Sequence, residues 1–294
     1  MSRPRKMHEP LDVSFLEALS AIADAQRPEF QEAEARPFIK WAGGKRGILP
    51  ELVARVPKVY RTYREPFVGG GALFFALKPS SAYLADVNFH LVLAYLAVRD
   101  QVDELIAQLR LHESKHGAEY FKRARTRLGR EKDPVKVAAL FIYLNKTCYN
   151  GLYRVNRAGE FNVPIGSYVE PAILDDPNLR AASRMLQGVE IKQHVFSQTP
   201  LDNGDFYYLD PPYHKTFDGY DSSRFGDEDH KQLAEFCCHL EDQRCFFMLS
   251  NSDTPFVRGL YKGFKIEQVA APRYVSCKGD QRGKETELVI RNYD

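Results

Sequence analysis

Cysteine is scarce in this chain, and long apolar runs are missing. The five cysteines contain no CxxC pair, so the sequence predicts free thiols in a reducing compartment rather than a disulfide framework or a zinc site. No stretch approaches the roughly 18 consecutive apolar residues of a membrane span. The amino-terminal stretch carries Asp12, Glu17 and Asp24 where a secretory signal needs an unbroken apolar segment. These absences predict a cytoplasmic protein with no metal site and no membrane anchor.

Net charge is also small, at +2 over 294 residues. The basic residues are nevertheless concentrated, because segment 121–157 holds ten Lys or Arg against two acidic residues, a local excess of +8. A block this basic in a near-neutral chain is typical of a polyanion-binding surface, and equally of a solvated helix face. Charge alone leaves both interpretations open.

The rest of the composition, 44% hydrophobic and 27% charged, is that of a globular protein. Residues 1–36 form an extension to which we assign no function. A capping box at Ser14 and Glu17 predicts a short helix there, and a polar linker follows it.

From residue 37 onward, strand and helix patterns alternate at both ends of the chain. The predicted strands are 63–67, 82–85, 206–209, 246–249 and 288–290. The predicted helices are 72–77, 91–98, 102–111, 120–128, 135–144 and 228–240, and segment 145–168 has no helical period. This pattern predicts an α/β protein with one sheet assembled from both halves of the chain and a helical, basic insertion in the middle.

A glycine turn follows the first predicted strand, in the stretch EPFVGGGA that contains Gly69 and Gly71. Glycines there let the backbone approach a ligand and free N–H groups at a helix start. Asp86 closes the next strand, where a carboxylate can accept hydrogen bonds from a ribose diol. The glycine turn does not match a phosphate-binding loop. The earlier Gly-Gly-Lys sequence that ends at Lys45 does not match one either, because Arg46 stands where such a loop needs Ser or Thr. The glycine turn and Asp86 together predict a nucleoside cofactor, although the glycines alone are equally consistent with a packing turn.

The tetrapeptide Asp210-Pro211-Pro212-Tyr213 follows the apolar strand 206–209. Reactive groups of open α/β sheets lie at the carboxyl ends of strands. The two prolines have no N–H, so the turn offers only acceptors, the Asp210 carboxylate and the Pro211 carbonyl. Two acceptors beside the aromatic ring of Tyr213 suit a planar base that carries an amino group. The alternative is a rigid turn with a capping aspartate.

These motifs, in the order FIKWAGGK, EPFVGGGA, Asp86 and DPPY, resemble the Dam-type (D12 class) DNA adenine-specific methyltransferases over residues 37–294. The resemblance implies a Rossmann-like catalytic domain of residues 37–90 and 168–294, with a DNA-recognition domain, 91–167, inserted into it. It also implies S-adenosyl-L-methionine as the methyl donor and the DPPY residues as the catalytic loop. The positions that would contact the cofactor are Trp41, Lys45, Phe67, Gly69, Gly71, Asp86 and Asp210.

Segment 149–164 combines aromatic, amide and guanidinium side chains with glycine turns, the groups that can enter a base stack and read base edges. From composition alone, an ordinary surface hairpin is equally consistent. The segment is similar to the recognition hairpin of Dam enzymes that methylate GATC in double-stranded DNA by base flipping. The resemblance implies DNA contacts at Tyr149, Asn150, Leu152, Arg154, Asn156 and Pro164. Ser167 departs from the basic residue that the family pattern would place there.

Two other functions remain open at this point. An RNA adenine methyltransferase would use the same loop, and a non-catalytic DNA-binding relative would keep the fold. A protein-glutamine methyltransferase would more naturally carry Asn before the two prolines, and a cytosine-carbon enzyme would need a Pro-Cys loop, which the sequence lacks. We therefore expect a cytoplasmic enzyme of bacterial or phage origin, bound to the nucleoid and without an obligate protein partner, whose role in restriction-modification or elsewhere is open.

Overall fold

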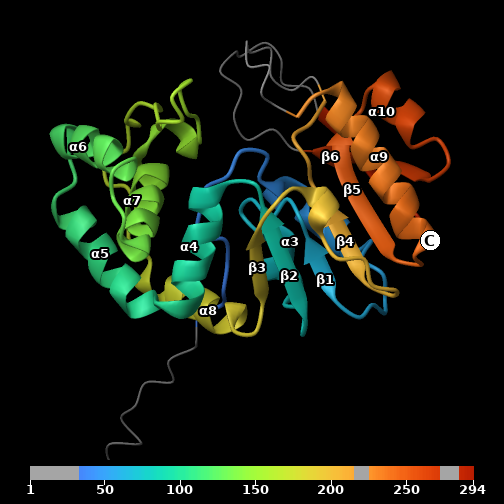
Figure 1. Cartoon of the computed structure of the whole chain (residues 1–294), viewed down its shortest axis with the longest axis horizontal. Coiled ribbons are helices and arrows are strands. Elements are labelled where there is room, and N and C mark those ends of the chain that lie inside the picture. The colour runs from blue at the N-terminus through green and yellow to red at the C-terminus, as the bar shows by residue number, and fades with distance from the viewer. Residues whose placement is uncertain (1–32, 215–224, 272–284) are drawn as a thin grey trace, which may run out of the picture. The chain divides into compact units, whose positions relative to one another are not determined.

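A seven-stranded sheet with the order β3-β2-β1-β4-β5-β7-β6 lies at the centre of the computed structural model (Figure 1). The structure describes residues 33–214, 225–271 and 285–294. The strands are β1 (Tyr63–Glu65), β2 (Ala82–Asp86), β3 (Glu190–Gln193), β4 (Phe206–Leu209), β5 (Phe246–Ser252), β6 (Lys265–Ala271) and β7 (Glu285–Arg291). The helices are α2 (Leu49–Val53), α3 (Ala72–Leu77), α4 (Phe89–Asp100), α5 (Val102–Ser114), α6 (Ala118–Leu128), α7 (Pro134–Thr147), α8 (Asp176–Leu186), α9 (Asp227–Asp242) and α10 (Pro255–Leu260), with short 3₁₀ turns η1 (Lys45–Gly47), η2 (Tyr149–Gly151) and η3 (Phe196–Gln198).

Strands β1 to β5 run parallel, and β7 lies antiparallel between β5 and β6. From β1 the chain adds β2 and β3 on one side, and it then returns to add β4 and β5 on the other side of β1. The strand order therefore reverses between β1 and β4. In open α/β sheets, ligands bind outside the carboxyl ends of the strands at such a reversal. The topology therefore places the ends of β1, β2 and β4 at the expected position of a binding site.

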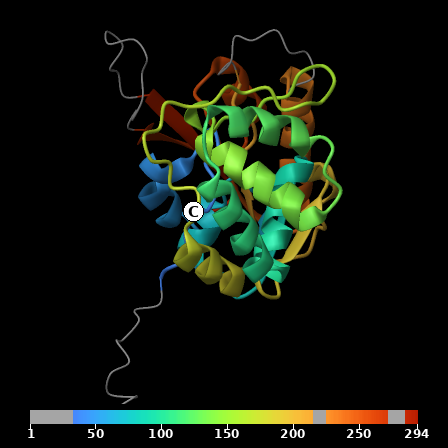
Figure 2. The same cartoon turned by 90° about the vertical axis from the view of Figure 1, so that its left-hand side faces the viewer.

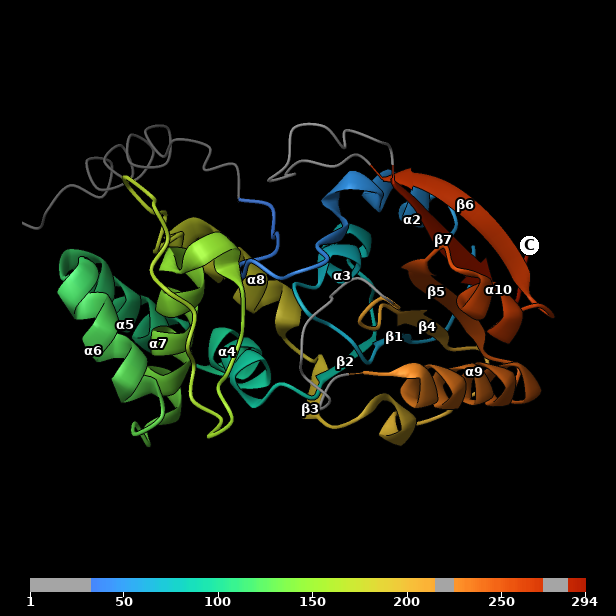
Figure 3. The ribbon, with the colours of Figure 1, turned by 90° about the horizontal axis from the view of Figure 1, so that it is seen from above.

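Apolar side chains on both faces of the sheet build two cores. In β4, Phe206 and Tyr208 join the core that includes α3, whereas Tyr207 and Leu209 join the core that includes α9. This alternation follows from the period of two in a strand, with helices covering both faces. Figure 3 shows α9 along one face and α2 and α3 along the other.

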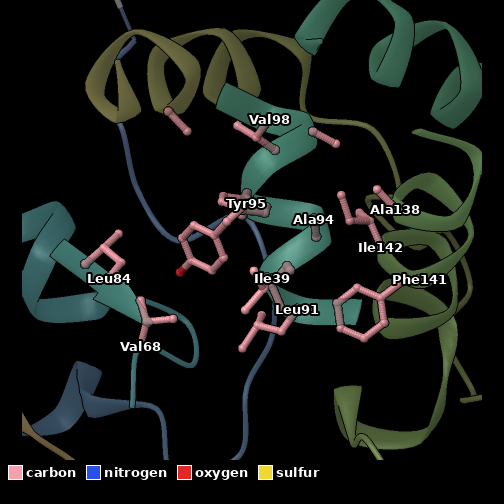
Figure 4. Packing of buried hydrophobic residues seen from close by; sticks show 14 of the residues in the cluster. Ile39, Val68, Leu84, Leu91, Ala94, Tyr95, Val98, Ala138, Phe141 and Ile142 are labelled. Atoms are coloured by element: carbon pink, nitrogen blue, oxygen red, sulfur yellow. The ribbon is translucent and has the colours of Figure 1, made fainter. Parts of the chain in front are cut away.

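Helix α4 packs against the sheet on one side and against the helical segment on another. Asn88 caps its start by accepting a hydrogen bond from the Leu91 N–H (3.1 Å). Figure 4 shows Tyr95 on the side of α4 toward Leu84 of β2, and Phe141 of α7 on another side. One apolar cluster therefore runs from the sheet through α4 into α7. The predicted domain boundary at residue 90 falls inside this helix.

Helices α5, α6 and α7 form the helical segment, which Figure 2 views face on. Asp133 caps α7, because its carboxylate accepts hydrogen bonds from the Val135 and Lys136 N–H groups (3.0 and 3.1 Å). Most of α7 is buried, and α5 and α6 pack around it. The hairpin that follows α7 is thus attached to a well-packed helix.

Several sequence boundaries need correction. The apolar pattern predicted that the helix after residue 135 ends at 144, but α7 continues to Thr147. The pattern missed this last turn because the polar residue Asn145 is buried there. Strand β1 is shorter and β5 longer than predicted. The sequence missed β3, a mostly exposed edge strand, and also β6, α8 and α10. The predicted helix near residues 14–22 lies outside the described residues.

Cysteines 148, 237, 238 and 245 are free thiols, as the spacing predicted, and Cys277 lies outside the described residues. Among the helices of the described part, none has the length and apolar character needed to cross a membrane.

Candidate functional site

The glycine turn after β1 has a backbone that only glycine adopts easily. Gly69 and Gly71 have φ values of +47° and +66°. A Cβ at Gly69 would stand 2.6 Å from Cδ1 of Trp41, and one at Gly71 would stand 2.7 Å from the Tyr95 hydroxyl. The Tyr95 hydroxyl also donates a hydrogen bond to the Gly69 carbonyl (3.1 Å). The turn is therefore fixed by close packing, with its backbone against the indole ring.

Asp86 lies at the end of β2 and holds this turn in place. Its Oδ2 accepts a hydrogen bond from the Gly69 N–H (3.2 Å), and its Oδ1 accepts one from the Asn88 N–H (2.9 Å). Burial raises the pKa of Asp86 to about 6, although these backbone hydrogen bonds lower it. Each carboxylate oxygen has a second lone pair. Asp86 can therefore accept two further hydrogen bonds from a diol without losing the turn.

Aromatic rings line this region on two sides. Trp41 stacks on Tyr153 of the hairpin with ring centroids 6.1 Å apart. Phe67 stacks instead on Phe196 (5.5 Å) and meets the edge of Phe225. The predicted residues Trp41, Gly69 and Asp86 thus come together, while Phe67 belongs to an aromatic group of the α9 core.

The DPPY loop begins where β4 ends. The Lys45 ammonium lies 2.8 Å from Asp210 Oδ2 and also donates a hydrogen bond to the Gly43 carbonyl (2.6 Å). The other oxygen, Asp210 Oδ1, is buried and accepts no hydrogen bond from the described residues. Burial raises the pKa of Asp210 to about 6, and Lys45 lowers it. Because leaving a buried acceptor unsatisfied is costly, Oδ1 marks a position where a donor is missing.

Contacts from β5 and β7 hold the rest of this loop. Asn251 Oδ1 accepts a hydrogen bond from the His214 N–H (3.1 Å), and the Ser252 hydroxyl donates one to the His214 carbonyl (2.7 Å). The Tyr213 hydroxyl donates a hydrogen bond to Glu287 Oε2 (2.6 Å). Pro211 is buried and Pro212 is exposed. The loop is therefore fixed on both sides of Tyr213.

A further carboxyl group, that of Glu65, was missed as a site residue by the sequence analysis. Glu65 ends β1, is buried, and accepts a hydrogen bond from the Tyr63 hydroxyl (2.9 Å). Burial raises its pKa well above the usual range, the Tyr63 hydrogen bond lowers it, and Asp210 and Asp86 raise it further. Only the position of Glu65 at a strand end could have pointed to it. Asn251 and Glu287 were missed for a different reason, since their roles depend on strand register.

The predicted recognition residues lie on an irregular hairpin, residues 148–166, after α7. Antiparallel bridges join Cys148 to Ile165 and Val155 to Phe161. Tyr149 is 46% exposed although it follows directly after the buried residues Thr147 and Cys148. Asn150 has a left-handed backbone (φ +52°). The hairpin thus presents an aromatic ring and an amide to solvent rather than to the core.

Asn145 attaches the hairpin to the segment that leads to Trp41. Its amide donates hydrogen bonds to the carbonyls of Lys40 (2.7 Å) and Gly151 (3.1 Å), and its oxygen accepts one from the Lys40 N–H (2.9 Å). Gly151 has φ +63°, and a Cβ there would stand 2.5 Å from Cβ of Lys40. The hairpin and the Trp41 segment therefore share one packed junction.

Arg154 and Asn156 have different environments within the hairpin. The exposed Arg154 guanidinium donates to Asn162 Oδ1 (2.7 Å) and to the Asn162 carbonyl (3.3 Å). The Asn156 side chain instead accepts from the Ala158 and Glu160 N–H groups (2.9 and 3.0 Å), which closes the hairpin tip. Leu152 is partly buried against the core, and Pro164 is exposed. Arg154 is oriented yet accessible, whereas the structure gives Asn156 a turn-forming role.

Four of the ten basic residues of segment 121–157, at positions 122, 123, 125 and 127, lie on α6. One face of this helix and the turn after it form a shallow depression of about 460 Å³ lined by Lys122, Arg123, Thr126, Arg127 and Arg130. Glu119 and Glu131 pair with Lys122 (2.8 Å) and Arg127 (2.5 Å). The helix buries Phe121, Ala124 and Leu128 on its other face. This is the distribution of a solvated amphipathic helix whose outer face is strongly positive.

The fold, together with the glycine turn, Asp86 and the DPPY loop at the strand ends, defines an α/β enzyme of the Rossmann-like methyltransferase class. Comparison with known proteins specifies the class further. Residues 41–274 match the family described as D12 class N6 adenine-specific DNA methyltransferase. The chain therefore belongs to this family and is an enzyme that methylates adenine in DNA.

Relatives in curated collections agree with this assignment. A type II methyltransferase, M.MjaIII of Methanocaldococcus jannaschii, is 42% identical over 289 residues, covering 88% of this chain and 100% of the relative. Another, M1.LlaDCHI of Lactococcus lactis subsp. cremoris, is 38% identical, covering 88% and 95%. The DNA adenine methylase of Escherichia coli K12 is 33% identical, covering 86% and 94%.

Proposed function

We propose that this enzyme transfers a methyl group from S-adenosyl-L-methionine to the exocyclic amino nitrogen of a flipped adenine in double-stranded DNA, at the sequence GATC. The observation that carries the proposal is the buried Asp210 Oδ1, which has no donor among the described residues. It lies at the end of β4, next to the strand that carries the glycine turn. An amine that enters this position satisfies the orphaned oxygen.

The residues present fit the proposed cofactor. The space where a Cβ would stand at Gly69 and Gly71 is filled by Trp41 and the Tyr95 hydroxyl, so the glycine turn is a fixed backbone support beside Asp86. Asp86 has the lone pairs to accept from both ribose hydroxyls. The bound cofactor would supply a methyl group on a sulfonium, a good leaving group that an amine displaces directly. Trp41 and Lys45 would complete the contacts on the other side of the turn.

The chain's own residues then act on the amino group. An aromatic amine is a weak nucleophile because its lone pair is delocalised into the ring. Asp210 Oδ1 and the Pro211 carbonyl accept hydrogen bonds from the amino group, which localises the lone pair, and Tyr213 stacks on the base. Once the nitrogen carries the methyl group it loses one proton, for which Asp210 Oδ1 is the adjacent acceptor. Most of the rate enhancement would come from orienting the nitrogen roughly 3 to 3.5 Å from the methyl carbon.

The hairpin supports the choice of duplex DNA and of GATC. Flipping a base costs a few kcal/mol that protein contacts must offset. The exposed Tyr149 can enter the gap in the stack, while Asn150 can pair with the remaining base. Arg154 is fixed by Asn162 through Nε and Nη2, so the rest of its guanidinium can contact guanine in the major groove. Leu152 and Pro164 would contact a thymine. We also propose 91–167 as the recognition domain.

The test is to express the protein in a host free of DNA methylation and to sequence the modified sites. We expect N6-methyladenine at GATC, and far less of it when Asp210→Ala is expressed. Purified enzyme with labelled cofactor should modify duplex DNA and not RNA of the same sequence. Methylation of RNA alone would favour the RNA enzyme, and absence of any transfer would favour a non-catalytic relative.

A further inference from the structure

Glu287 is a carboxylate beside the acceptor loop that the proposed chemistry does not use. It pairs with Ser252 in the β5–β7 register. Because β7 runs antiparallel to β5, its first residues lie at the carboxyl end of the parallel strands, where β4 leads into Asp210. The sheet therefore brings Glu287 to the loop from a strand 74 residues further along the chain.

Glu287 contacts the hydroxyl group of Tyr213. The Tyr213 hydroxyl donates to Glu287 Oε2 at 2.6 Å, a short distance typical of a hydrogen bond to a charged acceptor. Next to Tyr213 in the chain, the His214 N–H is held by Asn251. Burial, Asp210 and Glu287 raise the pKa of Tyr213, so its hydroxyl keeps the proton that it donates. The ring is thus anchored at its hydroxyl as well as through the backbone.

We propose that Glu287 is a positioning residue for methyl transfer, which holds the Tyr213 ring in the orientation on which the target adenine stacks. The inference rests on the proposed function, in which Tyr213 stacks on the flipped base. Its physical basis is preorganisation, because a ring that is already fixed loses no rotational freedom when the base arrives. A carboxylate at the hydroxyl also makes the ring more electron-rich, which favours contact with a base that gains positive charge as the methyl arrives.

The experiment compares Glu287→Ala, Glu287→Gln, Tyr213→Phe and the double variant Glu287→Ala/Tyr213→Phe. Single-turnover rates are measured at saturating cofactor and GATC duplex. We expect Glu287→Ala and Tyr213→Phe each to slow transfer about ten- to hundredfold. The double variant should be no slower than the slower single variant, because both changes remove one contact. Glu287→Gln keeps an acceptor oxygen and should recover part of the rate.

Thr286→Ala is the matched control, since Thr286 is the exposed neighbour of Glu287 on the same strand. It should leave the rate unchanged. Cofactor affinity and thermal midpoint should stay at wild-type values in Tyr213→Phe, which separates positioning from a structural defect. Any of three results would overturn the proposal. The first is an unchanged rate in Glu287→Ala, and the second is a double variant whose rate loss equals the product of the two single losses. The third is a Glu287→Gln rate as low as that of Glu287→Ala.

Failure of the proposed function gives a different result. In that case wild-type enzyme transfers no methyl group to adenine, or Asp210→Ala transfers it at the wild-type rate. If instead Asp210→Ala is inactive while Glu287→Ala is fully active, only the role of Glu287 is wrong.

Discussion

The ammonium of Lys45 lies 2.8 Å from Oδ2 of Asp210 and leaves the other oxygen of that carboxylate without a partner among the described residues. The two oxygens therefore have separate tasks. Lys45 stabilises the charged form through Oδ2, while Oδ1 remains available to a substrate donor. Burial of Asp210, which raises its pKa, and Lys45, which lowers it, together set the pH range in which the carboxylate is charged.

Removing the acceptor should lower the turnover number strongly. We expect Asp210→Ala to lower the turnover number at saturating DNA by about 10² to 10³, the range seen when one preorganised transition-state contact is lost. Cofactor affinity, measured by calorimetry, should fall far less than the turnover number. Near-normal turnover would show that Asp210 is not the acceptor.

The rate should also fall in acid. Below a pKa of about 6, Asp210 binds a proton, so its negative charge is lost and kcat/KM for DNA should decrease as the pH drops through this value. Lys45 lowers that pKa, so Lys45→Met should move the acidic limb to higher pH. Both profiles are measured at saturating cofactor, because kcat/KM reports groups of the enzyme before DNA binds.

The control for this profile is Asp86→Asn, because Asp86 also has a pKa of about 6. If Asp210 is responsible, the acidic limb persists in Asp86→Asn. Its disappearance there, or an unmoved limb in Lys45→Met, would assign the profile to another group.

Cofactor affinity should depend on Asp86. Asp86→Ala removes a charged acceptor whose hydrogen bonds are worth ~1.5–3 kcal/mol each, so calorimetry should show at least a tenfold weaker affinity for S-adenosyl-L-methionine. The same change frees the Gly69 N–H, which Asp86→Asn can still satisfy. A cofactor affinity equal to wild type in Asp86→Ala would exclude the ribose assignment.

Sequence choice should depend on Arg154. Bidentate contact with guanine is worth ~1–3 kcal/mol of discrimination. Arg154→Ala should therefore reduce methylation at GATC while hardly affecting sites altered at the matching G·C pair. Arg123→Ala on the positive outer face of α6 is the comparison, because a residue that contacts only phosphate would weaken binding to all sequences alike and lower the salt slope by about 1 when removed. If Arg154→Ala instead reduces methylation equally at every site, Arg154 contacts the DNA backbone rather than guanine.

The sequence was sufficient to predict those parts of the site that depend on strand ends. Asp86 ends one apolar strand and Asp210 follows another, and parallel strands bring their carboxyl ends to one edge, so the pattern places both carboxylates at that edge of the sheet. Glu287 could not be found in this way, because its place depends on the register of an antiparallel strand. Strand β3 was missed because an exposed edge strand has little apolar signal.

The hairpin shows the same limit at the level of single side chains. Composition marked Arg154 and Asn156 alike as polar groups able to contact DNA. Only the structure distinguishes them, since the Asn156 side chain closes the hairpin tip with its own neighbours, while Arg154 is oriented by Asn162 and stays exposed. Which polar group a turn uses depends on backbone geometry that the residue types leave open.

The position of β7 has a consequence for protein synthesis. Among the described strands β7 is the last along the chain, yet it lies between β5 and β6. While the ribosome is still adding it, β5 has an open edge and β6 has no neighbour in the sheet, and such edges promote aggregation. Translation that stops before β7 would thus release a sheet that cannot close, with the loop tyrosine still lacking the glutamate that anchors it.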